Sequence, residues 1–521
     1  MALKKLPIGL QDFRKIIEND FKYIDKTRYI YQICQSPGAY FLSRPRRFGK
    51  SITIATMQEL YLGSKKLFKG LWIEDKWDWD LKRKVIRFSL KDVNFEQLGL
   101  EKALFDRMEE LSINLNVPVT RTTARDQFRE MIQVLGQKHK VVVLIDEYDA
   151  PIIHYLGKDL SKAEDNRELL KGFYGVLKEL DARIELVFLT GVSKFSKVGI
   201  FSGLNNLRDL SMDAQYATML GYTQEELESN FVEEIELASE KLNLSRADLL
   251  EQMRLWYNGY RFEEDAIKVY NPVSSNLFFE QQKFYNFWFA TGTPSFLINI
   301  LKAEGIFDLH FPATSFAGFE SFELDQIKPI ALLFQTGYLT IQSKDEDGLI
   351  NLDYPNKEVR DSMLELLIEG FVGVDAELSP ALIIKMRNAF RANDLERVIQ
   401  ILQEVFKKLP FFLHERYPEK FFHAAIHLLF SYLGVRIHSE VCTSDGRIDS
   451  LVETDTHIYI LEYKLDQSAQ VALEQIKRKR YYQAYWTMGK PVVGVGVNFS
   501  SESKNIEDWV EEEFIVEKLK S

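Results

Sequence analysis

Three apolar segments in the N-terminal half, each followed by polar residues, limit the fold of this chain more than any other feature of its sequence. They lie at 40–42, 141–145 and 184–189, and the residues that follow them are Ser43, Asp146 with Glu147, and Thr190. Apolar runs without polar alternation are typical of strands that are covered on both faces. The pattern predicts an α/β domain with a parallel sheet.

The first segment leads into a loop, Ser43–Ser51, with the sequence Ser-Arg-Pro-Arg-Arg-Phe-Gly-Lys-Ser, and a helix is predicted over 52–62. This context is typical of a phosphate-binding loop, in which backbone N–H groups near Gly49 face the phosphates. Lys50 would then bridge the β and γ phosphates, and the Ser51 hydroxyl would ligate Mg²⁺. The loop departs from the usual pattern because Arg44 occupies the position of the first glycine.

Two further arginines in this loop, Arg46 and Arg47, have two open interpretations. They are candidates for neutralising phosphate charge, and they are equally candidates for ion pairs that anchor the loop.

The other two segments end in residues suited to the same nucleotide. In P-loop ATPases the first acid after such a strand holds Mg²⁺ and the second polarises the attacking water, which gives these roles to Asp146 and Glu147. Thr190 stands where AAA-type ATPases carry a polar sensor of the γ-phosphate or the water. Together the three segments indicate a site for ATP and Mg²⁺.

Near the C-terminus, the stretch 446–464 reads as two strands joined by a turn around Asp455-Thr456. In that hairpin the numbers of opposed residues add to 911, so Asp449 faces Glu462, with Cβ atoms about 4.5–5.5 Å apart. Lys464 lies on the same face as Glu462. Two carboxylates this close repel unless a proton or cation lies between them, so the pattern predicts a divalent metal with a lysine beside it.

A structural interpretation of the hairpin stays open. Arg447 faces Lys464, so the four charged side chains would also form a cross-strand salt-bridge quartet on an exposed strand. The apolar run 458–461 argues against it, because charges at the end of a buried strand are costly unless they are used. Glu440, on the preceding strand, is either a third acidic metal ligand or an ordinary solvated glutamate.

The pattern Asp449…Glu462-x-Lys464 resembles the signature of the PD-(D/E)XK nuclease superfamily. The order helix–strand–strand–strand–helix–strand over about the last hundred residues is similar to the core of that superfamily, with helices expected at about 418–433 and 469–486. The resemblance implies that Asp449 and Glu462 hold Mg²⁺ and that Lys464 positions or activates water. Gln475 matches a residue often present on the second helix of these nucleases.

The chain as a whole closely resembles a bacterial AAA-ATPase-like family that often carries such a domain. The matching stretches are 6–9, 23–27, 43–51, 145–149, 256–262 and 270–272. The resemblance implies a P-loop NTPase (AAA-like) core over 1–210 and a mainly helical lid, winged-helix-like and connector region over 211–405. It also implies an α/β restriction-endonuclease-like domain over 406–521.

Bulk properties bound the function. The net charge of −11 argues against general nucleic-acid binding, so contact with DNA, which we favour over RNA, needs local basic patches such as Arg44–Lys50 or Lys477–Arg480. The second patch is also read as a solvated face. No apolar stretch reaches membrane-spanning length, and two cysteines give no disulfide framework, so we expect a cytoplasmic protein. AAA-type proteins often form rings, which makes a homo-oligomer a further expectation.

These observations predict an ATP-binding and ATP-hydrolysing protein coupled to a metal-dependent nuclease domain. Two alternatives remain: a nucleotide-dependent switch or scaffold whose nuclease-like domain binds a partner without cutting, and a remnant of a mobile element without activity.

Overall fold

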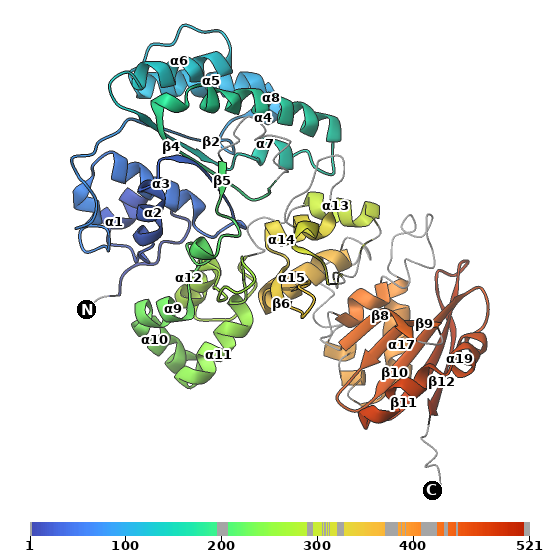
Figure 1. Cartoon of the computed structure of the whole chain (residues 1–521). Coiled ribbons are helices and arrows are strands. Elements are labelled where there is room, and N and C mark those ends of the chain that lie inside the picture. The colour runs from blue at the N-terminus through green and yellow to red at the C-terminus, as the bar shows by residue number, and fades with distance from the viewer. Residues whose placement is uncertain are drawn as a thin grey trace. The chain divides into compact units, whose positions relative to one another are not determined.

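The computed structural model describes most of the chain (Figure 1). The described residues are 3–194, 207–288, 295–304, 306, 309, 311, 313–319, 328–369, 384–386, 388–390, 392–407, 425–431, 436–443 and 446–514, with the backbone alone for 295, 296, 303, 436–443, 446, 447 and 487. The chain divides into two compact units, Met1–Leu297 with His310–Arg360, and Ile298–Leu309 with Asp361–Ser521.

The first unit is built on a five-stranded sheet. Its strands are β1 (Gly38–Ser43), β2 (Val85–Ser89), β3 (Val141–Asp146), β4 (Ile184–Gly191) and β5 (Leu207–Asp209), in the order β2-β3-β4-β1-β5. Every pairing between them is parallel, with Ser43 opposite Gly191 and Ser89 opposite Asp146. The carboxyl ends of β1, β3 and β4 therefore meet at one edge of the sheet, which confirms the predicted parallel sheet.

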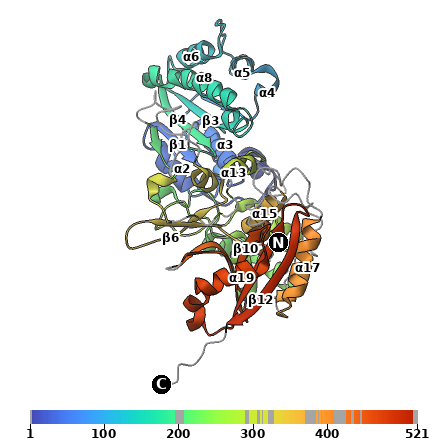
Figure 2. The same cartoon turned by 90° about the vertical axis from the view of Figure 1, so that its right-hand side faces the viewer.

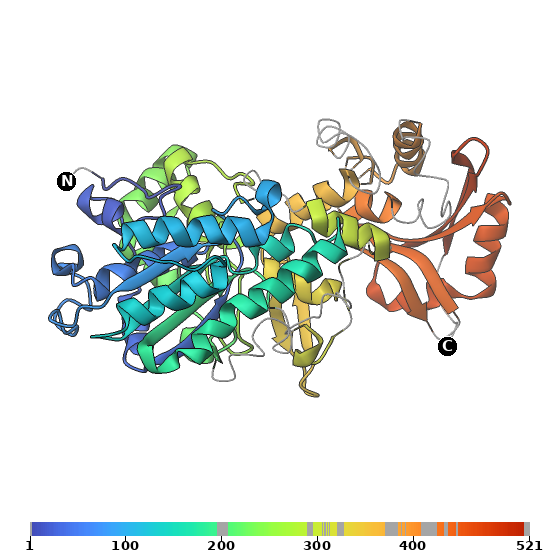
Figure 3. The same cartoon turned by 90° about the horizontal axis from the view of Figure 1, so that it is seen from above.

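Helices cover both faces of this sheet. Those of the N-terminal part are α1 (Phe13–Glu18), α2 (Thr27–Cys34), α3 (Lys50–Tyr61), α4 (Phe95–Leu98), α5 (Leu100–Asn114), α6 (Ala124–Leu135), α7 (Ala150–Ile153) and α8 (Leu160–Glu179). Helices α5, α6 and α8 lie side by side over one face (Figures 1 and 3). On β2, Phe88 packs against α6 and α8, whereas the neighbouring Arg87 reaches Gln58 of α3 on the other face. All six residues of β3 are buried, as the apolar run predicts.

The middle of the chain is mainly helical. Its elements are α9 (Gln224–Asn230), α10 (Val232–Leu242), α11 (Arg246–Tyr257), α12 (Pro272–Gln281), α13 (Ser295–Glu304), α14 (Pro329–Thr336), the hairpin of β6 (Thr340–Lys344) and β7 (Ile350–Asp353), and α15 (Lys357–Leu367). A capping box between Thr223 and Glu226 starts α9. The helical middle region is thus confirmed.

The sequence pattern from Phe284 to Lys302 predicts a helix, whereas α13 of the structure starts at Ser295. The aromatic residues at its expected start are not helical because their contacts lie elsewhere. Phe284 packs against Tyr257 and Phe278, and the Trp288 backbone N–H is donated to a side chain instead of to a helical carbonyl. These rings belong to a hydrophobic core.

The second unit contains another five-stranded sheet. Its elements are α17 (Leu395–Phe406), a helical stretch at 425–431, β8 (Arg436–Thr443), β9 (Gly446–Glu453), β10 (Ile458–Leu465), α19 (Ala469–Arg478), β11 (Val492–Ser500) and β12 (Asn505–Phe514). The strand order is β12-β11-β10-β9-β8, and only β10 and β11 are parallel. Helices α17 and α19 lie on opposite faces, because Phe406 contacts Phe499 of β11 whereas Gly496 of the same strand faces α19 (Figure 2).

The helix expected over 469–486 ends at Arg478, and a 3-10 segment covers Tyr481–Met488. Arg480 has φ 50° and breaks the helix in the left-handed region. The break turns Tyr481, Tyr482 and Trp486 into the apolar cluster of the second sheet. Burial of these rings compensates for the strained residue. Strand β12 was not expected from the sequence, because its consecutive acidic residues do not show the alternation of apolar and polar residues that predicts a strand.

A pH-dependent stability is expected from Glu358, on α15. Its side chain is fully buried, and burial raises its pKa to about 7, although it accepts hydrogen bonds from the Trp288 N–H and the Ser274 hydroxyl. The folded chain then keeps a proton that the unfolded chain releases near pH 4.5, so the stability that this group contributes is lost as pH rises from about 5 to above 7. Glu358→Gln should flatten this fall, measured as the midpoint of thermal unfolding at pH 5.5 and 7.5.

The matched control is Glu236→Gln, which changes an exposed glutamate on α10 and should leave the pH dependence as in the wild type. An unaltered pH dependence in Glu358→Gln would contradict the raised pKa.

Candidate functional site

Arg44 fills the position of the missing loop glycine and is only 1% exposed. Its guanidinium donates hydrogen bonds to the backbone oxygens of Ser43 (2.8 Å), Ser211 (2.5 Å) and Tyr216 (3.2 Å). It also stacks 4.1 Å above the ring of Phe262. Burial lowers the pKa of Arg44 to about 9. The arginine therefore anchors the loop to the rest of the first unit.

Lys50 begins α3 directly after the loop, and Gly49, with φ 96°, takes the left-handed conformation that glycine tolerates. The Lys50 ammonium donates to the backbone oxygens of Arg44 (2.7 Å) and Pro45 (2.9 Å). Burial lowers the pKa of Lys50, and the charges of Glu147 and Asp146 oppose this effect. Ser51 is the next residue of α3 and is half-buried.

The acids at the end of β3 lie beside this lysine. One carboxylate oxygen of Asp146 accepts hydrogen bonds from the Thr190 hydroxyl (2.5 Å) and from the backbone N–H of Glu147 (3.0 Å). Glu147 has φ 48° and lies 3.9 Å from the Lys91 ammonium, and burial raises its pKa. The structure thus brings Lys50, Asp146, Glu147 and Thr190 together at one edge of the sheet, as the three apolar segments suggested.

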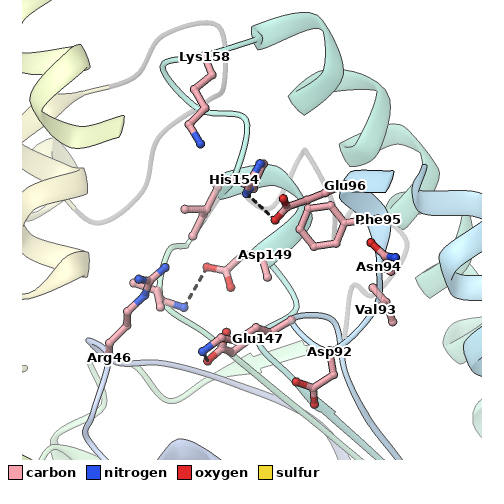
Figure 4. A pocket seen from close by; sticks show the side chains of 14 residues that line it. Arg46, Asp92, Val93, Asn94, Phe95, Glu96, Glu147, Asp149, His154 and Lys158 are labelled. Carbon is pink, nitrogen blue, oxygen red and sulfur yellow. Dashed lines mark hydrogen bonds and ion pairs between the residues drawn. The ribbon is translucent and has the colours of Figure 1, made fainter. Parts of the chain in front are cut away.

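A cavity of about 630 Å³ opens beside these acids (Figure 4). Arg46 and Glu147 line it together with residues of the β2–α4 connection, α4 and α7. The His154 imidazole, directly after α7, lies 3.2 Å from a carboxylate oxygen of Glu96 on α4. Arg47 does not line this cavity and has φ 72°. Of the two loop arginines, Arg46 is therefore the one placed to meet an anion at the acidic end of β3.

Asp149 is a functional candidate to which the sequence assigned no role. It is 1% exposed, and its Oδ2 atom accepts hydrogen bonds from the backbone N–H groups of Val192 (2.9 Å) and Ser193 (2.6 Å) and from the Ser193 hydroxyl (2.8 Å). Burial raises its pKa in spite of these bonds. Asp149 ties the segment after Thr190 to the segment after β3. The signals in the sequence were its nearness to Asp146 and Glu147 and its place in the matching stretch 145–149.

In the second unit the predicted hairpin register is confirmed, because Ile458 pairs with Glu453 and Leu461 with Ser450. Continuation of this register sets Asp449 opposite Glu462. Beyond the last pair, the Asp449 carboxylate accepts the backbone N–H of Tyr463 at 2.8 Å. Glu440 lies between the pairs Ser439–Ser450 and Val441–Ile448, but its side chain is outside the described part of the chain, as is that of Arg447.

Glu462 is the most unusual acid of this unit, at 1% exposed. Its Oε1 atom accepts hydrogen bonds from the Gln475 amide and from the Lys464 ammonium (3.5 Å). Its Oε2 atom is buried and has no hydrogen-bond partner among the described residues. Burial, and then the charge of Asp449, raise the pKa of Glu462 to about 8.

The donor set fits a divalent cation. A buried oxygen without a partner, beside a second carboxylate, is costly unless a proton or cation satisfies it. Carboxylate oxygens are also the ligands that Mg²⁺ prefers. Asp449 and Glu462 would hold the ion, which would polarise a bound water or phosphate oxygen. Burial of Glu462 sets it apart from an exposed salt-bridge quartet.

The basic run Lys477–Arg480 does not form a single helical face, because α19 ends at Arg478. The Lys477 ammonium lies 2.5 Å from a carboxylate oxygen of Glu512 on β12. One of these four cations is therefore already paired within the domain.

Comparisons with known proteins match both halves of the chain. Residues 7–201 match a family described as predicted AAA-ATPase, and residues 417–509 match a family of the PD-(D/E)XK nuclease superfamily. A protein of Azotobacter chroococcum mcd 1, described as an uncharacterized protein in the vnfD 5′ region, is 36% identical over 537 aligned positions. The alignment covers 98% of this chain and 99% of that protein.

Solved structures resemble the chain only weakly. A STAND protein with a tetratricopeptide repeat sensor from Pyrococcus horikoshii is 12% identical, with a TM-score of 0.23 over 79% of this chain; the match spans just 57% of that protein. The ORC2 protein of Aeropyrum pernix, in ADPNP–ADP complexes, is 11% identical, with a TM-score of 0.30 over 82% of this chain and 91% of its own. TM-scores this low do not establish a shared arrangement.

Replacement of Glu462 by glutamine tests the cation site without a catalytic assay. In metal-free buffer at pH 7.5, Glu462→Gln should raise the midpoint of thermal unfolding by about 2–4 °C, because the folded wild type must keep a proton on Glu462 that the unfolded chain releases, and glutamine removes this cost. Millimolar Mg²⁺ should stabilise the wild type and leave the variant unchanged. Glu474→Gln, an exposed change on α19, is the control and should respond to Mg²⁺ like the wild type. Equal stabilisation of both proteins by Mg²⁺ would exclude Glu462 as a ligand.

Proposed function

We propose, from the premise that this chain belongs to the family of predicted AAA-ATPases with a C-terminal PD-(D/E)XK nuclease superfamily domain, that it hydrolyses ATP and cleaves phosphodiester bonds of nucleic acid. The observation that carries the nuclease half is the buried, unpartnered oxygen of Glu462 beside Asp449 and Lys464. The observation that supports the ATPase half is the convergence of Lys50 with Asp146 and Glu147.

In the nucleotide site, the chain's own groups divide the work. Backbone N–H groups after Gly49 and the Lys50 ammonium would bind the phosphates, with Arg46, which lines the cavity, neutralising their charge. Ser51 and Asp146 would hold Mg²⁺, which supplies Lewis acidity when bound. Glu147 would orient and polarise water, and Thr190 would position it, because its hydroxyl already bonds to Asp146.

In the C-terminal site, Asp449 and Glu462 would hold Mg²⁺, with Glu440 as a third acidic ligand. Lys464 lies within 3.5 Å of Glu462 and would position the attacking water and stabilise the developing negative charge. Gln475 would fix the Glu462 carboxylate through its amide. A matched set of this kind suits in-line hydrolysis of a phosphodiester.

The substrate that we propose is nucleic acid, with DNA favoured over RNA. Contact would come from local basic groups, because the net charge of −11 opposes the phosphate backbone. No helix in the described part of the chain is long and apolar enough to cross a membrane. We further propose a cytoplasmic location and self-association through the ATPase core.

A second candidate function is a nucleotide-dependent switch whose nuclease-like domain binds a partner without cutting. The acidic strand β12 favours it, since Glu507, Asp508 and Glu511–Glu513 oppose a polyanion at this edge of the sheet. The intact trio of Asp449, Glu462 and Lys464 weighs against it.

Cleavage of DNA with Mg²⁺ or Mn²⁺ tests the nuclease half. Lys464→Ala and Glu462→Ala should each lower the rate by about 100-fold or more, because each removes a group that acts on the water or the metal. Lys490→Ala is the matched control: this lysine pairs with Glu453 at 2.7 Å, at the far end of the hairpin, and its loss should leave the rate unchanged. Equal rates in the wild type and the Glu462→Ala and Lys464→Ala variants would refute the nuclease.

The ATPase half predicts two separable defects. Lys50→Ala should abolish ATP binding, measured by equilibrium titration, whereas Glu147→Gln should retain binding and lose about 100-fold in turnover, since only the polarisation of water is removed. Lys65→Ala, an exposed change in the 3-10 turn after α3, should match the wild type in both assays. Full turnover by Glu147→Gln would remove that residue from the mechanism.

A further inference from the structure

The nucleotide loop is held from the middle region of the chain as well as from its own sheet. The ring of Phe48 packs against Tyr260 (4.8 Å between centroids) and Phe262 (5.4 Å). Pro45 packs against Gly337, where any Cβ atom would lie 2.7 Å from the proline ring. Residues that follow the loop by more than two hundred positions in the sequence therefore restrict how it moves.

Trp288 makes the contact with the loop backbone. Its indole N–H donates to the backbone oxygen of Arg46 at 3.4 Å, and its ring packs against Tyr338 at 5.1 Å. Its backbone N–H donates to a carboxylate oxygen of Glu358 at 2.8 Å. One residue thus connects the loop to a buried carboxyl group.

Glu358 fixes the other end of this connection. Its second carboxylate oxygen accepts the Ser274 hydroxyl at 2.8 Å, so both oxygens are used and the side chain has little freedom. Glu358 is the second residue of α15 (Lys357–Leu367). The division between the two compact units falls inside this helix, between Arg360 and Asp361. A displacement of Trp288 therefore acts on the helix that carries the chain into the second unit.

The hydrogen bonds of Lys50 to the loop backbone would change when a nucleotide binds. Its ammonium has three N–H donors, and two of them go to the backbone oxygens of Arg44 and Pro45. A phosphate that draws the ammonium toward itself would compete with these carbonyls, which lie directly before Arg46. The backbone oxygen of Arg46, which accepts the Trp288 indole N–H, is thus next in the chain to the oxygens of Arg44 and Pro45 that nucleotide binding would release.

We propose that Trp288 is a positioning residue of the nucleotide loop which, held by Glu358, transmits nucleotide binding to α15 and so regulates the C-terminal site. This inference rests on the proposed function only in that ATP is the nucleotide and hydrolysis of nucleic acid the regulated activity. The contacts form an unbroken series from Arg46 through Trp288 and Glu358 to the helix. Coupling between sites in proteins typically changes affinity or rate by about 5- to 150-fold.

The test compares the full-length wild type with Trp288→Phe. This variant loses the indole N–H but keeps the aromatic ring and the backbone N–H that binds Glu358. Hydrogen–deuterium exchange is measured over 357–367 with and without ATP, and DNA cleavage with Mg²⁺ is measured under the same two conditions. In the wild type, ATP should change exchange in α15 and alter the cleavage rate by about 5-fold or more.

In Trp288→Phe, ATP should still bind within about threefold of the wild-type affinity, while both ATP-dependent changes fall to the level of no nucleotide. Trp79→Phe is the matched control, because its indole N–H also donates to a backbone oxygen, that of Glu74 at 2.8 Å, away from the loop. This control should keep both changes. It separates the loss of the proposed relay, the series of contacts from Arg46 through Trp288 and Glu358 to α15, from the loss of any indole hydrogen bond.

The outcomes separate the relay from the proposed function. Two results would overturn the relay and leave the ATPase and nuclease proposals intact. One is an ATP-dependent change of hydrogen exchange in Trp288→Phe that equals that of the wild type. The other is hydrogen exchange in α15 of the wild type that is the same with and without bound ATP. Cleavage that is absent from the wild type would end the nuclease proposal, and the exchange measurement would still decide whether Trp288 connects the loop to α15. Failure of the wild type to bind ATP would overturn both, and titration reveals it directly.

Discussion

Desolvation of carboxylates is the constraint on which the rest of this structure depends. Removal of an ionised carboxylate from water is expensive unless hydrogen bonds or opposite charges replace the water. Asp149 meets part of this requirement with three donors to one oxygen, and Glu358 with donors to both of its oxygens. Glu462 does not, because one of its oxygens is buried without a partner among the described residues. Asp149 and Glu358 hold segments of the chain together through hydrogen bonds, whereas Glu462 has an oxygen that a ligand such as a cation would satisfy.

The cost of burying polar groups without partners also explains a nucleotide loop without its first glycine. A glycine lets a loop take unusual dihedral angles, but it adds no bond. Arg44 instead satisfies three backbone oxygens and stacks on Phe262, so the loop is shaped by hydrogen bonds from a buried cation. The usual glycine remains only at Gly49, where φ is 96°. The presence of Arg44 at the position of the usual first glycine therefore does not imply that phosphate binding is lost.

Much of this arrangement could be predicted from the sequence because it depends on local pattern. Apolar runs located β1, β3 and β4, and a two-residue period with a turn at Asp455 fixed the hairpin register that sets Asp449 against Glu462. The break of α19 at Arg480 was not predictable from helical periodicity, because tertiary packing of Tyr481 and Trp486 outweighs it. Asp149 was missed for a related reason: its partners are backbone groups more than forty residues away.

Acidity at the edge of the second sheet limits how a polyanion would reach the C-terminal site. Strand β12 exposes Glu507, Asp508 and Glu511–Glu513, and Glu512 takes up the charge of Lys477. Repulsion of this kind lowers non-specific binding more than specific binding, because specific contacts add local cations and hydrogen bonds. An enzyme with such a surface would stay inactive on bulk nucleic acid until a second signal favours its site. Nucleotide binding at the loop of Lys50, transmitted through Trp288 and Glu358 as proposed above, would be a physical source of that signal.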